Sequence, residues 1–404
     1  MGNRRVSAPR TPADLATRPV LTVVGLISGT SADGIDAAVV RIVGSAEGVA
    51  HCATLGGLTV PFDDALRVRL LAAGAARADE VARLHALLGE RFAAAALAAI
   101  DAVGLRRDEV DAIGSHGQTV AHVPRSRAAG AVGAPAGAVT LQVGCAARIA
   151  ERTGLPVVSD FRSRDTAAGG EGAPLVPYAD WLLLRTTAAT RLALNLGGVA
   201  NVTLVTPRAE DVRAFDTGPA NGPLDAAARR LLGASCDRDG AAAARGTVDA
   251  AEVARVLSDP WFDTPPPRSL ARETFGERLV ADLLARRADL APEDVLATLT
   301  EVVARTVERA LRDHLRVGAA GVAPPCDVVV SGGGVRNVTL MARLAAVLRP
   351  LPVRSSAELG IDPDLREAVA FALLAGASLR GLPGNLPGVT GAAGPRVLGS
   401  FTLP

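Results

Sequence analysis

The feature that most constrains the fold of this 404-residue chain is an order of strands and helices that occurs twice. Apolar runs and helical periodicity predict, in each half, three consecutive strands followed by alternating helices and strands. In the first half we expect strands at 21–28, 35–43, 52–60, 110–115 and 156–161, and helices at 79–103, 141–152 and 175–184. In the second half we expect strands at 191–196, 201–206, 212–216, 326–331 and 352–356, and helices between 224 and 316 and at 337–348 and 365–379. Both halves therefore have the order βββαβαβα, and the second half carries extra helices after its third strand.

This repeat predicts an α/β fold built from two duplicated lobes, because such alternation buries the strands in sheets covered by helices. We expect a first lobe at 20–187 and a second lobe, with a helical insertion, at 188–384. Residues 1–19 have the proline breaks of a flexible leader, and the glycine- and proline-rich residues 385–404 are expected to form a tail on the surface. Ligands prefer the cleft that two lobes form.

Charge and composition exclude several classes of protein. The 43 basic and 42 acidic residues leave a net charge of +1, which does not indicate binding to nucleic acid or to an anionic membrane. All 43 basic residues are arginine, so a Walker A lysine, the ATP-binding lysine of protein kinases and a lysine Schiff base are excluded. The four cysteines are far apart, and the apolar run at 20–27 is too short to span a bilayer, so we expect a cytoplasmic protein with reduced thiols.

Three glycine-rich turns follow strands, at residues 28–36, 195–201 and 331–334. Glycine lets the backbone approach a phosphate closely, and successive N–H groups can form a nest for an anion. Each turn alone is better explained as a tight turn without a ligand. Their equivalent places in a duplicated fold favour a nucleotide. Asp33, in the first turn, is then the better candidate ligand for Mg²⁺, whereas Asp36 can equally be a residue that stabilises the turn.

Seven motifs, in this order, resemble those of the anhydro-N-acetylmuramic acid kinase family. They are residues 25–36 (GLISGTSADGID), 114–120 (GSHGQTV), 160–162 (DFR), 169–177 (GGEGAPLVP), 195–201 (NLGGVAN), 215–219 (FDTGP) and 332–337 (GGGVRN). Each motif is weak alone, but the ordered set is strong, and the similarity covers essentially all of residues 21–400.

The resemblance implies the actin/sugar-kinase/Hsp70 fold and a kinase of peptidoglycan recycling. Such enzymes convert 1,6-anhydro-N-acetylmuramic acid, ATP and water into N-acetylmuramic acid 6-phosphate and ADP. The resemblance also implies a small-molecule substrate, ATP with Mg²⁺ as cofactors, and a possible homodimer. From its motifs, the residues expected to bind the nucleotide are Gly29, Thr30, Ser31, Ala32, Asp33, Gly34, Ile35, Asp36, Gly197, Gly198, Asn201, Gly332, Gly333 and Gly334. Asp33 is also the expected metal ligand. The residues expected to bind the sugar are His116, Gln118, Arg162 and Asp165.

Two carboxylates are the candidate catalytic residues. Water is a poor nucleophile, so a base must lie within hydrogen-bond reach of it. The resemblance assigns this role to Asp216, which precedes a Gly-Pro turn and alone can equally be a turn residue. The resemblance also places Glu367 near the attacked carbon, although a glutamate there can equally complement a helix dipole.

Residues 268–273 (RSLARE) depart from the family's usual Lys-Ser-Thr-Gly-Arg-Glu and retain Arg272 and Glu273. Two alternatives stay open, and this departure is the main support of the first. One is a kinase of the same fold that acts on another sugar or carboxylate, and the other is a non-catalytic nucleotide switch.

Overall fold

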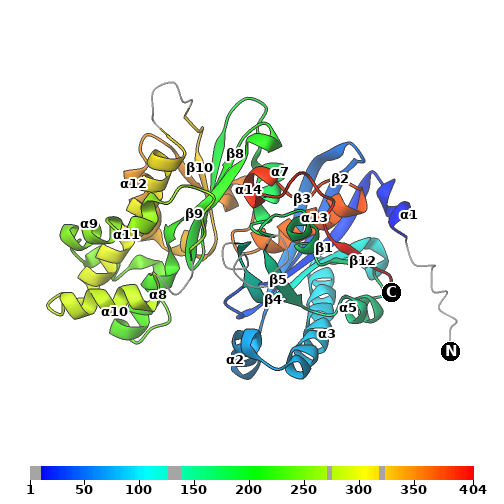
Figure 1. Cartoon of the computed structure of the whole chain (residues 1–404), viewed down its shortest axis with the longest axis horizontal. Coiled ribbons are helices and arrows are strands. Elements are labelled where there is room, and N and C mark those ends of the chain that lie inside the picture. Colours follow the sequence, from blue (N-terminus) through cyan, green and yellow to red (C-terminus); the bar gives the residue numbers. More distant parts are fainter. Residues whose placement is uncertain (1–10, 126–137, 271–274, 318–323) are drawn as a thin grey trace. The chain divides into compact units, whose positions relative to one another are not determined.

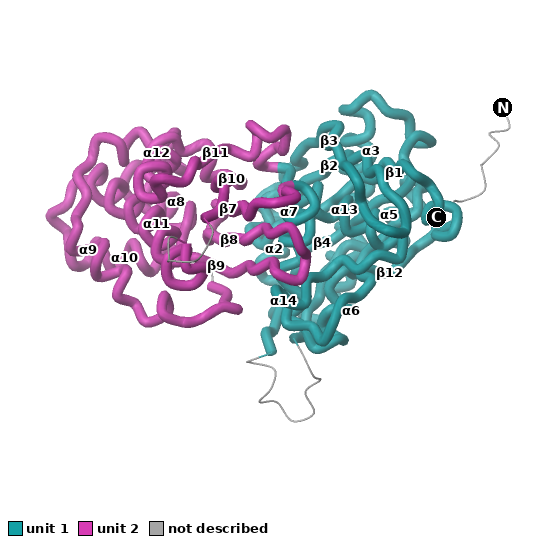
Figure 2. The backbone as a smooth tube through the Cα atoms, turned by 90° about the horizontal axis from the view of Figure 1, so that it is seen from above, with its two compact units in different colours: residues 1–183, 365–404 teal, residues 184–364 magenta. Residues whose placement is uncertain are grey.

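The computed structural model describes residues 11–125, 138–270, 275–317 and 324–404, and its chain divides into two compact units (Figures 1 and 2). Unit 1 contains the chain up to residue 183 together with residues 365–404, and unit 2 contains residues 184–364. Arg272 and Glu273 lie outside the described residues.

Unit 1 is built on a mixed sheet with the strand order β12-β6-β4-β1-β2-β3, and β5 pairs with β4. Its strands are β1 (Val20–Ser28), β2 (Gly34–Ser45), β3 (Gly48–Pro61), β4 (Ala112–Val123), β5 (Val139–Val143), β6 (Val157–Ser159) and β12 (Ser400–Thr402). Its helices are α1 (Pro12–Ala16), α2 (Asp64–Ala72), α3 (Ala78–Ala102), α5 (Ala146–Thr153), α6 (Ser163–Ala167), α13 (Arg366–Leu379) and α14 (Pro387–Thr390), and α7 (Val176–Leu184) ends at the boundary with unit 2.

Unit 2 is built on a five-stranded sheet with the order β11-β10-β7-β8-β9. Its strands are β7 (Arg191–Leu196), β8 (Val199–Val205), β9 (Arg213–Pro219), β10 (Val328–Ser331) and β11 (Val353–Ser355). Its helices are α8 (Asn221–Leu232), α9 (Ala250–Leu257), α10 (Glu277–Arg286), α11 (Pro292–His314) and α12 (Val338–Val347).

The two sheets share one topology. In unit 1, β1, β2 and β3 pair antiparallel in turn, and β4 pairs parallel with β1 and with β6. In unit 2, β7, β8 and β9 pair antiparallel in turn, and β10 pairs parallel with β7 and with β11. The antiparallel strand β5 is an addition to the sheet of unit 1. The predicted duplicated α/β fold is therefore confirmed at the level of strand order and direction. The helical insertion of unit 2 contains α8 to α11, and its longest helix, α11, buries one side against β9, α8 and α12.

The last long helix, α13, follows the final strand of unit 2 in sequence but packs on the sheet of unit 1. Glycines on β1 and β4 make this close approach possible. A Cβ atom at Gly25 would lie 1.8 Å from the carbonyl oxygen of Ala368, and one at Gly114 would lie 2.3 Å from that of Phe371. On the other face of β1, Val24 and Leu26 pack in the core that includes α3. The structure therefore groups residues 365–404 with unit 1, whereas the sequence-based boundary lay at residue 384.

Three local expectations differ from the structure. The helix expected at 141–152 begins only at Ala146, because Val139–Val143 forms β5, whose alternating pattern suits a strand paired with β4. The segment 385–404 is not a surface tail, since Asn385 is buried and β12 extends the sheet beside β6. In the leader, residues 11–19 contain α1 with Leu15 fully buried, and residues 1–10 lie outside the described residues.

Candidate active site

Asp216 is the middle residue of β9, at the point where the ladder between β8 and β9 is irregular. Asn201 of β8 pairs with Asp216, and the next pair joins Ala200 to Gly218, so Thr217 has no partner residue of its own. Such bulges reorient side chains and are frequent next to active sites. Asn195 of β7 pairs with Asn201 in turn. Directly paired residues share one face of a sheet, so Asn195, Asn201 and Asp216 form a polar row across three strands.

The carboxyl group of Asp216 is held by one oxygen. Its Oδ2 accepts a hydrogen bond of 2.7 Å from the backbone N–H of Leu270, while Oδ1 has no hydrogen bond within the described residues. Burial raises the pKa of Asp216 to about 6, against the opposing effects of the Leu270 N–H and of the Arg268 guanidinium. At neutral pH the group is thus mostly ionised, yet it is a stronger base than a free aspartate.

Asn201 belongs to this row beside Asp216. The sequence placed Asn201 at the nucleotide, but its side chain is partly exposed opposite Asp216 and makes no hydrogen bond with the described residues. Its amide is therefore free to bind a group that Asp216 also reaches.

The second and third glycine turns lie together in unit 2. The carbonyl oxygens of Gly197 and Gly198 accept hydrogen bonds from the backbone at the start of α8. Gly332 has a left-handed backbone (φ 81°), and a Cβ atom there would lie 2.8 Å from the carbonyl oxygen of Leu196. Gly333 and Gly334 begin a short helix (Gly333–Arg336), where first-turn N–H groups have no acceptor within the helix. These N–H groups are suited to bind an anion such as a phosphate.

The first glycine turn lies in unit 1, between β1 and β2. Thr30 and Asp33 are exposed on it, whereas Ala32 and Ile35 are buried. The side chains of Ala32 and Ile35 are part of the core, so these two residues could contact a nucleotide only through their backbone. Asp36 accepts a hydrogen bond of 2.6 Å from Thr59 on β3, so its carboxylate is used within the sheet.

Gln118 holds this first turn rather than presenting its amide to a ligand. Its Oε1 accepts a hydrogen bond from the Ser28 hydroxyl (2.5 Å), and its Nε2 donates to the carbonyl oxygens of Gly29 (3.0 Å) and Thr119 (3.2 Å). Only 2% of Gln118 is exposed. We therefore assign it a role in shaping the turn instead of the substrate contact that the sequence suggested.

His116 and Arg162 form a pair in unit 1. The Nε of Arg162 donates to Nε2 of His116 (3.0 Å), which places the imidazole proton on Nδ1, 3.0 Å from the Gly117 carbonyl oxygen. Burial lowers the pKa of His116 well below its usual range, and the Arg162 guanidinium lowers it further. The ring centroid of His116 lies 4.4 Å from that of Phe371. His116 is thus a fixed, neutral acceptor that orients Arg162.

Glu367 lies in the first turn of α13, partly buried and within electrostatic range of Arg162. Burial raises its pKa, two arginines (Arg366 and Arg162) lower it, and the carboxylates of Asp180 and Asp33 raise it again. Burial also lowers the pKa of Arg162 to about 10. The structure therefore gathers Arg162, Glu367 and Asp33 in one part of unit 1, as expected for a polar site.

Asp165 is fully buried and serves the interior of unit 1. Its oxygens accept hydrogen bonds from the Gly172 N–H (2.8 Å), the Asn385 amide (2.7 Å) and the Thr390 hydroxyl (2.7 Å). It has no surface for a ligand, so the expected substrate contact is corrected to a structural role that ties the C-terminal segment to α6.

The structure also shows two features that the sequence reasoning missed. Arg366, next to Glu367, makes a buried bidentate ion pair with Asp180. A single acidic residue in the apolar helix α7 was a usable signal, because a buried carboxylate needs a partner. Arg268 donates a hydrogen bond to the Asp216 carbonyl oxygen; it lies in the segment 268–273 whose departure from the family's usual sequence was a signal, but that signal did not indicate a contact with Asp216.

Two features are absent from the described ranges. No cluster of three or more His, Cys, Asp or Glu side chains there could hold a metal ion. No helix there is both long and apolar enough to cross a membrane.

Comparison with known proteins assigns the family. The family model "Anhydro-N-acetylmuramic acid kinase" matches residues 21–404. A protein of that name from Xanthomonas campestris pv. campestris (strain 8004) is 46% identical to this chain, and the alignment covers 94% of this chain and 96% of that protein. One from Gloeobacter violaceus is 47% identical, and the alignment covers 91% of this chain and 95% of that protein. One in Salinibacter ruber is 42% identical over 397 residues (95% and 96%). With a family model over nearly the whole chain and such relatives along their full length, the chain belongs to the anhydro-N-acetylmuramic acid kinase family.

Proposed function

We propose that this protein opens the 1,6-anhydro ring of 1,6-anhydro-N-acetylmuramic acid with water and phosphorylates O6 with ATP. The products are N-acetylmuramic acid 6-phosphate and ADP, and the reaction belongs to peptidoglycan recycling. The observation that carries the proposal is Asp216, a buried carboxyl group with one oxygen held by Leu270 and the other without a partner among the described residues. Family membership supports the substrate.

Asp216 acts as the general base. Its Oδ1 accepts a proton from water as the water oxygen bonds to C1 of the sugar. The bond between C1 and O6 breaks and leaves its electron pair on O6, which attacks the γ-phosphorus of ATP and releases ADP. The proton on Asp216 then passes to solvent. The amide of Asn201, the neighbour of Asp216 in the sheet, binds the same water or an adjacent hydroxyl.

The glycine turns bind the phosphates of ATP. The first N–H groups of the helix at Gly333 suit an anion, and the turn at Gly197 packs beside them. Asp33 is an exposed carboxylate on the first turn, a donor of the hard-oxygen type that Mg²⁺ prefers, so it fits a magnesium ion that accompanies the nucleotide. When bound, Mg²⁺ neutralises phosphate charge. A supply of ATP places the reaction in the cytoplasm.

Arg162 and Glu367 bind the sugar. The guanidinium of Arg162 is oriented by His116 and can make a bidentate contact with the lactyl carboxylate of the substrate. Glu367 has a pKa raised by burial and is therefore suited to a hydrogen bond with a sugar oxygen near C1.

The test is a coupled measurement of ADP release and sugar-phosphate formation from 1,6-anhydro-N-acetylmuramic acid. We expect saturable, Mg²⁺-dependent product from the wild type and from Asp282→Asn, a control at an exposed aspartate of α10. Asp216→Asn is expected to lose nearly all turnover. A folded wild type that binds ATP without turnover would refute the proposal and favour another substrate or a nucleotide switch.

A further inference from the structure

Arg268 binds the backbone on both sides of the Asp216 residue. Its Nε donates to the carbonyl oxygen of Asp216 (3.0 Å), and its own carbonyl oxygen accepts from the Asp216 N–H (3.3 Å). Two residues further on, Leu270 donates its N–H to the Asp216 carboxylate. The segment 268–270 therefore fixes both the main chain and the side chain of Asp216.

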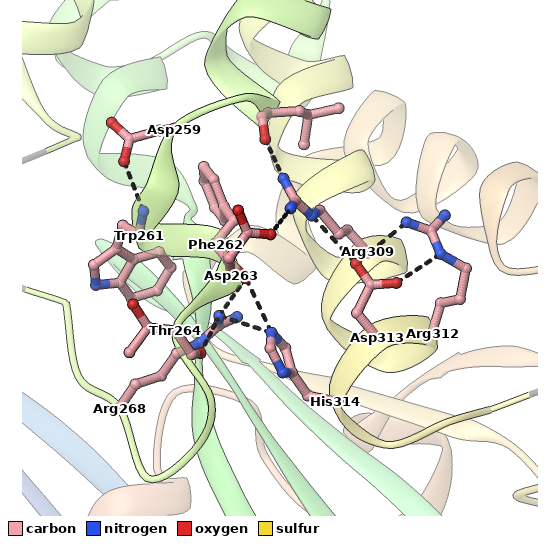
Figure 3. Close-up of polar contacts among 11 residues, drawn as sticks. Asp259, Trp261, Phe262, Asp263, Thr264, Arg268, Arg309, Arg312, Asp313 and His314 are labelled. Carbon is pink, nitrogen blue, oxygen red and sulfur yellow. Dashed lines mark hydrogen bonds and ion pairs between the residues drawn. The ribbon is translucent and has the colours of Figure 1, made fainter.

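The guanidinium of Arg268 is in turn held by the helical insertion (Figure 3). Its Nη1 donates to the carbonyl oxygens of Phe262 (2.8 Å) and Thr264 (3.0 Å) and lies 2.9 Å from Nε2 of His314, at the end of α11. Its Cζ lies 4.5 Å from the centroid of the Trp261 ring, a cation–π distance. Only 9% of Arg268 is exposed.

A second arginine, Arg309, lies near Arg268 and binds the same segment of the helical insertion. Arg309 on α11 contacts Asp263 and the Leu257 carbonyl oxygen, and its Nε lies 3.3 Å from Asp313 (Figure 3). The charged groups near Arg268 are thus Asp216 on one side and Arg309, Asp263 and Asp313 on the other.

We infer that Arg268 is a positioning residue, which holds Asp216 in register with Asn201 and leaves Oδ1 directed to the reacting water. The inference rests on the proposed function and deepens it. It also gives the replacement of the family's usual lysine by Arg268 a physical meaning, because the arginine keeps the positive charge and adds donors that reach three carbonyl oxygens.

Two variants separate positioning from simple packing. Arg268→Met keeps the apolar stem against Trp261 but removes the charge and the donors. Arg268→Lys keeps the charge. We expect Arg268→Met to lower kcat by about 10- to 100-fold, as misplacement of a catalytic group does, with a much smaller change in KM for the sugar. The control is Arg278→Ala, at an exposed arginine of α10, which is expected to retain wild-type kinetics.

The pH profile supplies a readout that packing alone would not change. The Arg268 cation lowers the pKa of Asp216, so its loss moves the acid limb of kcat/KM to higher pH, and Arg268→Lys is expected to restore the limb. A kcat of Arg268→Met within twofold of wild type, or an acid limb that does not move, would overturn the inference. If Arg268→Met does not fold, Arg268→Gln takes its place under the same criteria.

Titration of the Asp216 carboxyl carbon by ¹³C NMR, assigned with Asp216→Asn, makes the test independent of turnover. We expect a higher pKa in Arg268→Met than in wild type, without substrate present. A shifted pKa in an enzyme that does not use the anhydro-sugar would reject the proposed function but retain the inference, whereas equal pKa values would reject the inference alone.

Discussion

Burial of the Asp216 carboxyl raises its pKa from 3.8 to about 6, so an asparagine at this position is expected to stabilise unit 2 above pH 6. Each pKa unit corresponds to about 1.4 kcal/mol, and the buried carboxylate therefore costs about 3 kcal/mol of folding free energy when it is ionised. Asparagine removes that charge, and its Oδ1 can still accept the hydrogen bond from Leu270.

The pH dependence of this effect has a definite sign. Well below pH 3.8 the group is protonated in both the folded and the unfolded chain, so its charge costs nothing. As the pH rises from about 4 to 6, the unfolded chain ionises first, and wild-type stability falls relative to Asp216→Asn. Above about pH 6 the free energy of unfolding of Asp216→Asn exceeds that of wild type by the full amount of about 3 kcal/mol, and near pH 5 by about half of it.

Thermal and urea unfolding of wild type and Asp216→Asn at pH 5 and pH 8 measure this difference. Asp282→Asn, on the exposed face of α10, is the control and is expected to show little dependence on pH. The reasoning would be refuted if Asp216→Asn were no more stable than wild type at pH 8, or if its advantage were the same at both pH values.

Three further substitutions test unit 1. His116→Ala removes the hydrogen-bond acceptor of Arg162 and is expected to lower kcat/KM by about tenfold in steady-state assays. Because burial lowers the pKa of His116 well below its usual range, the pH profile of the wild-type kcat/KM is expected to show no change between pH 6 and 8 that is due to His116. Asp165→Ala leaves three buried hydrogen-bond donors without an acceptor, and each is expected to lower the free energy of unfolding by roughly 1–3 kcal/mol. A melting temperature unchanged from wild type would contradict the structural role of Asp165. Asp180→Ala leaves Arg366 as an uncompensated buried charge and is expected to cost about 3–5 kcal/mol in urea unfolding, and a loss below about 1 kcal/mol would speak against the buried pair.

The order of the strands was predictable because it depends on local patterns of apolar residues. Runs such as β1, apolar along its length, indicated strands covered on both faces, and the same order in two halves indicated a duplicated fold. The place of α13 was not predictable in the same way. It depends on Gly25 and Gly114 meeting the backbone of a helix more than 250 residues away in the chain.

For the candidate site, too, local sequence patterns were informative and long-range contacts were not predictable. The motifs singled out Asp216 and Arg162, which stay predicted site residues, but they could not separate ligand-binding polar groups from those used inside the protein. Asp165 hydrogen-bonds to Asn385, 220 residues away, and Gln118 to Gly29, 89 residues away. A local pattern cannot show such partners, since a buried polar group is satisfied by whatever the fold brings to it.

Hydrolytic ring opening coupled to phosphorylation is the central claim, and isotope incorporation tests it most directly. The enzyme is incubated with 1,6-anhydro-N-acetylmuramic acid and ATP in ¹⁸O-labelled water, and the products are examined by mass spectrometry, with unlabelled sugar phosphate in the same water as the exchange control. We predict one ¹⁸O atom at C1 of the sugar phosphate and none in its phosphate group. A phosphorylated product without label at C1, or with label in the phosphate, would contradict the account.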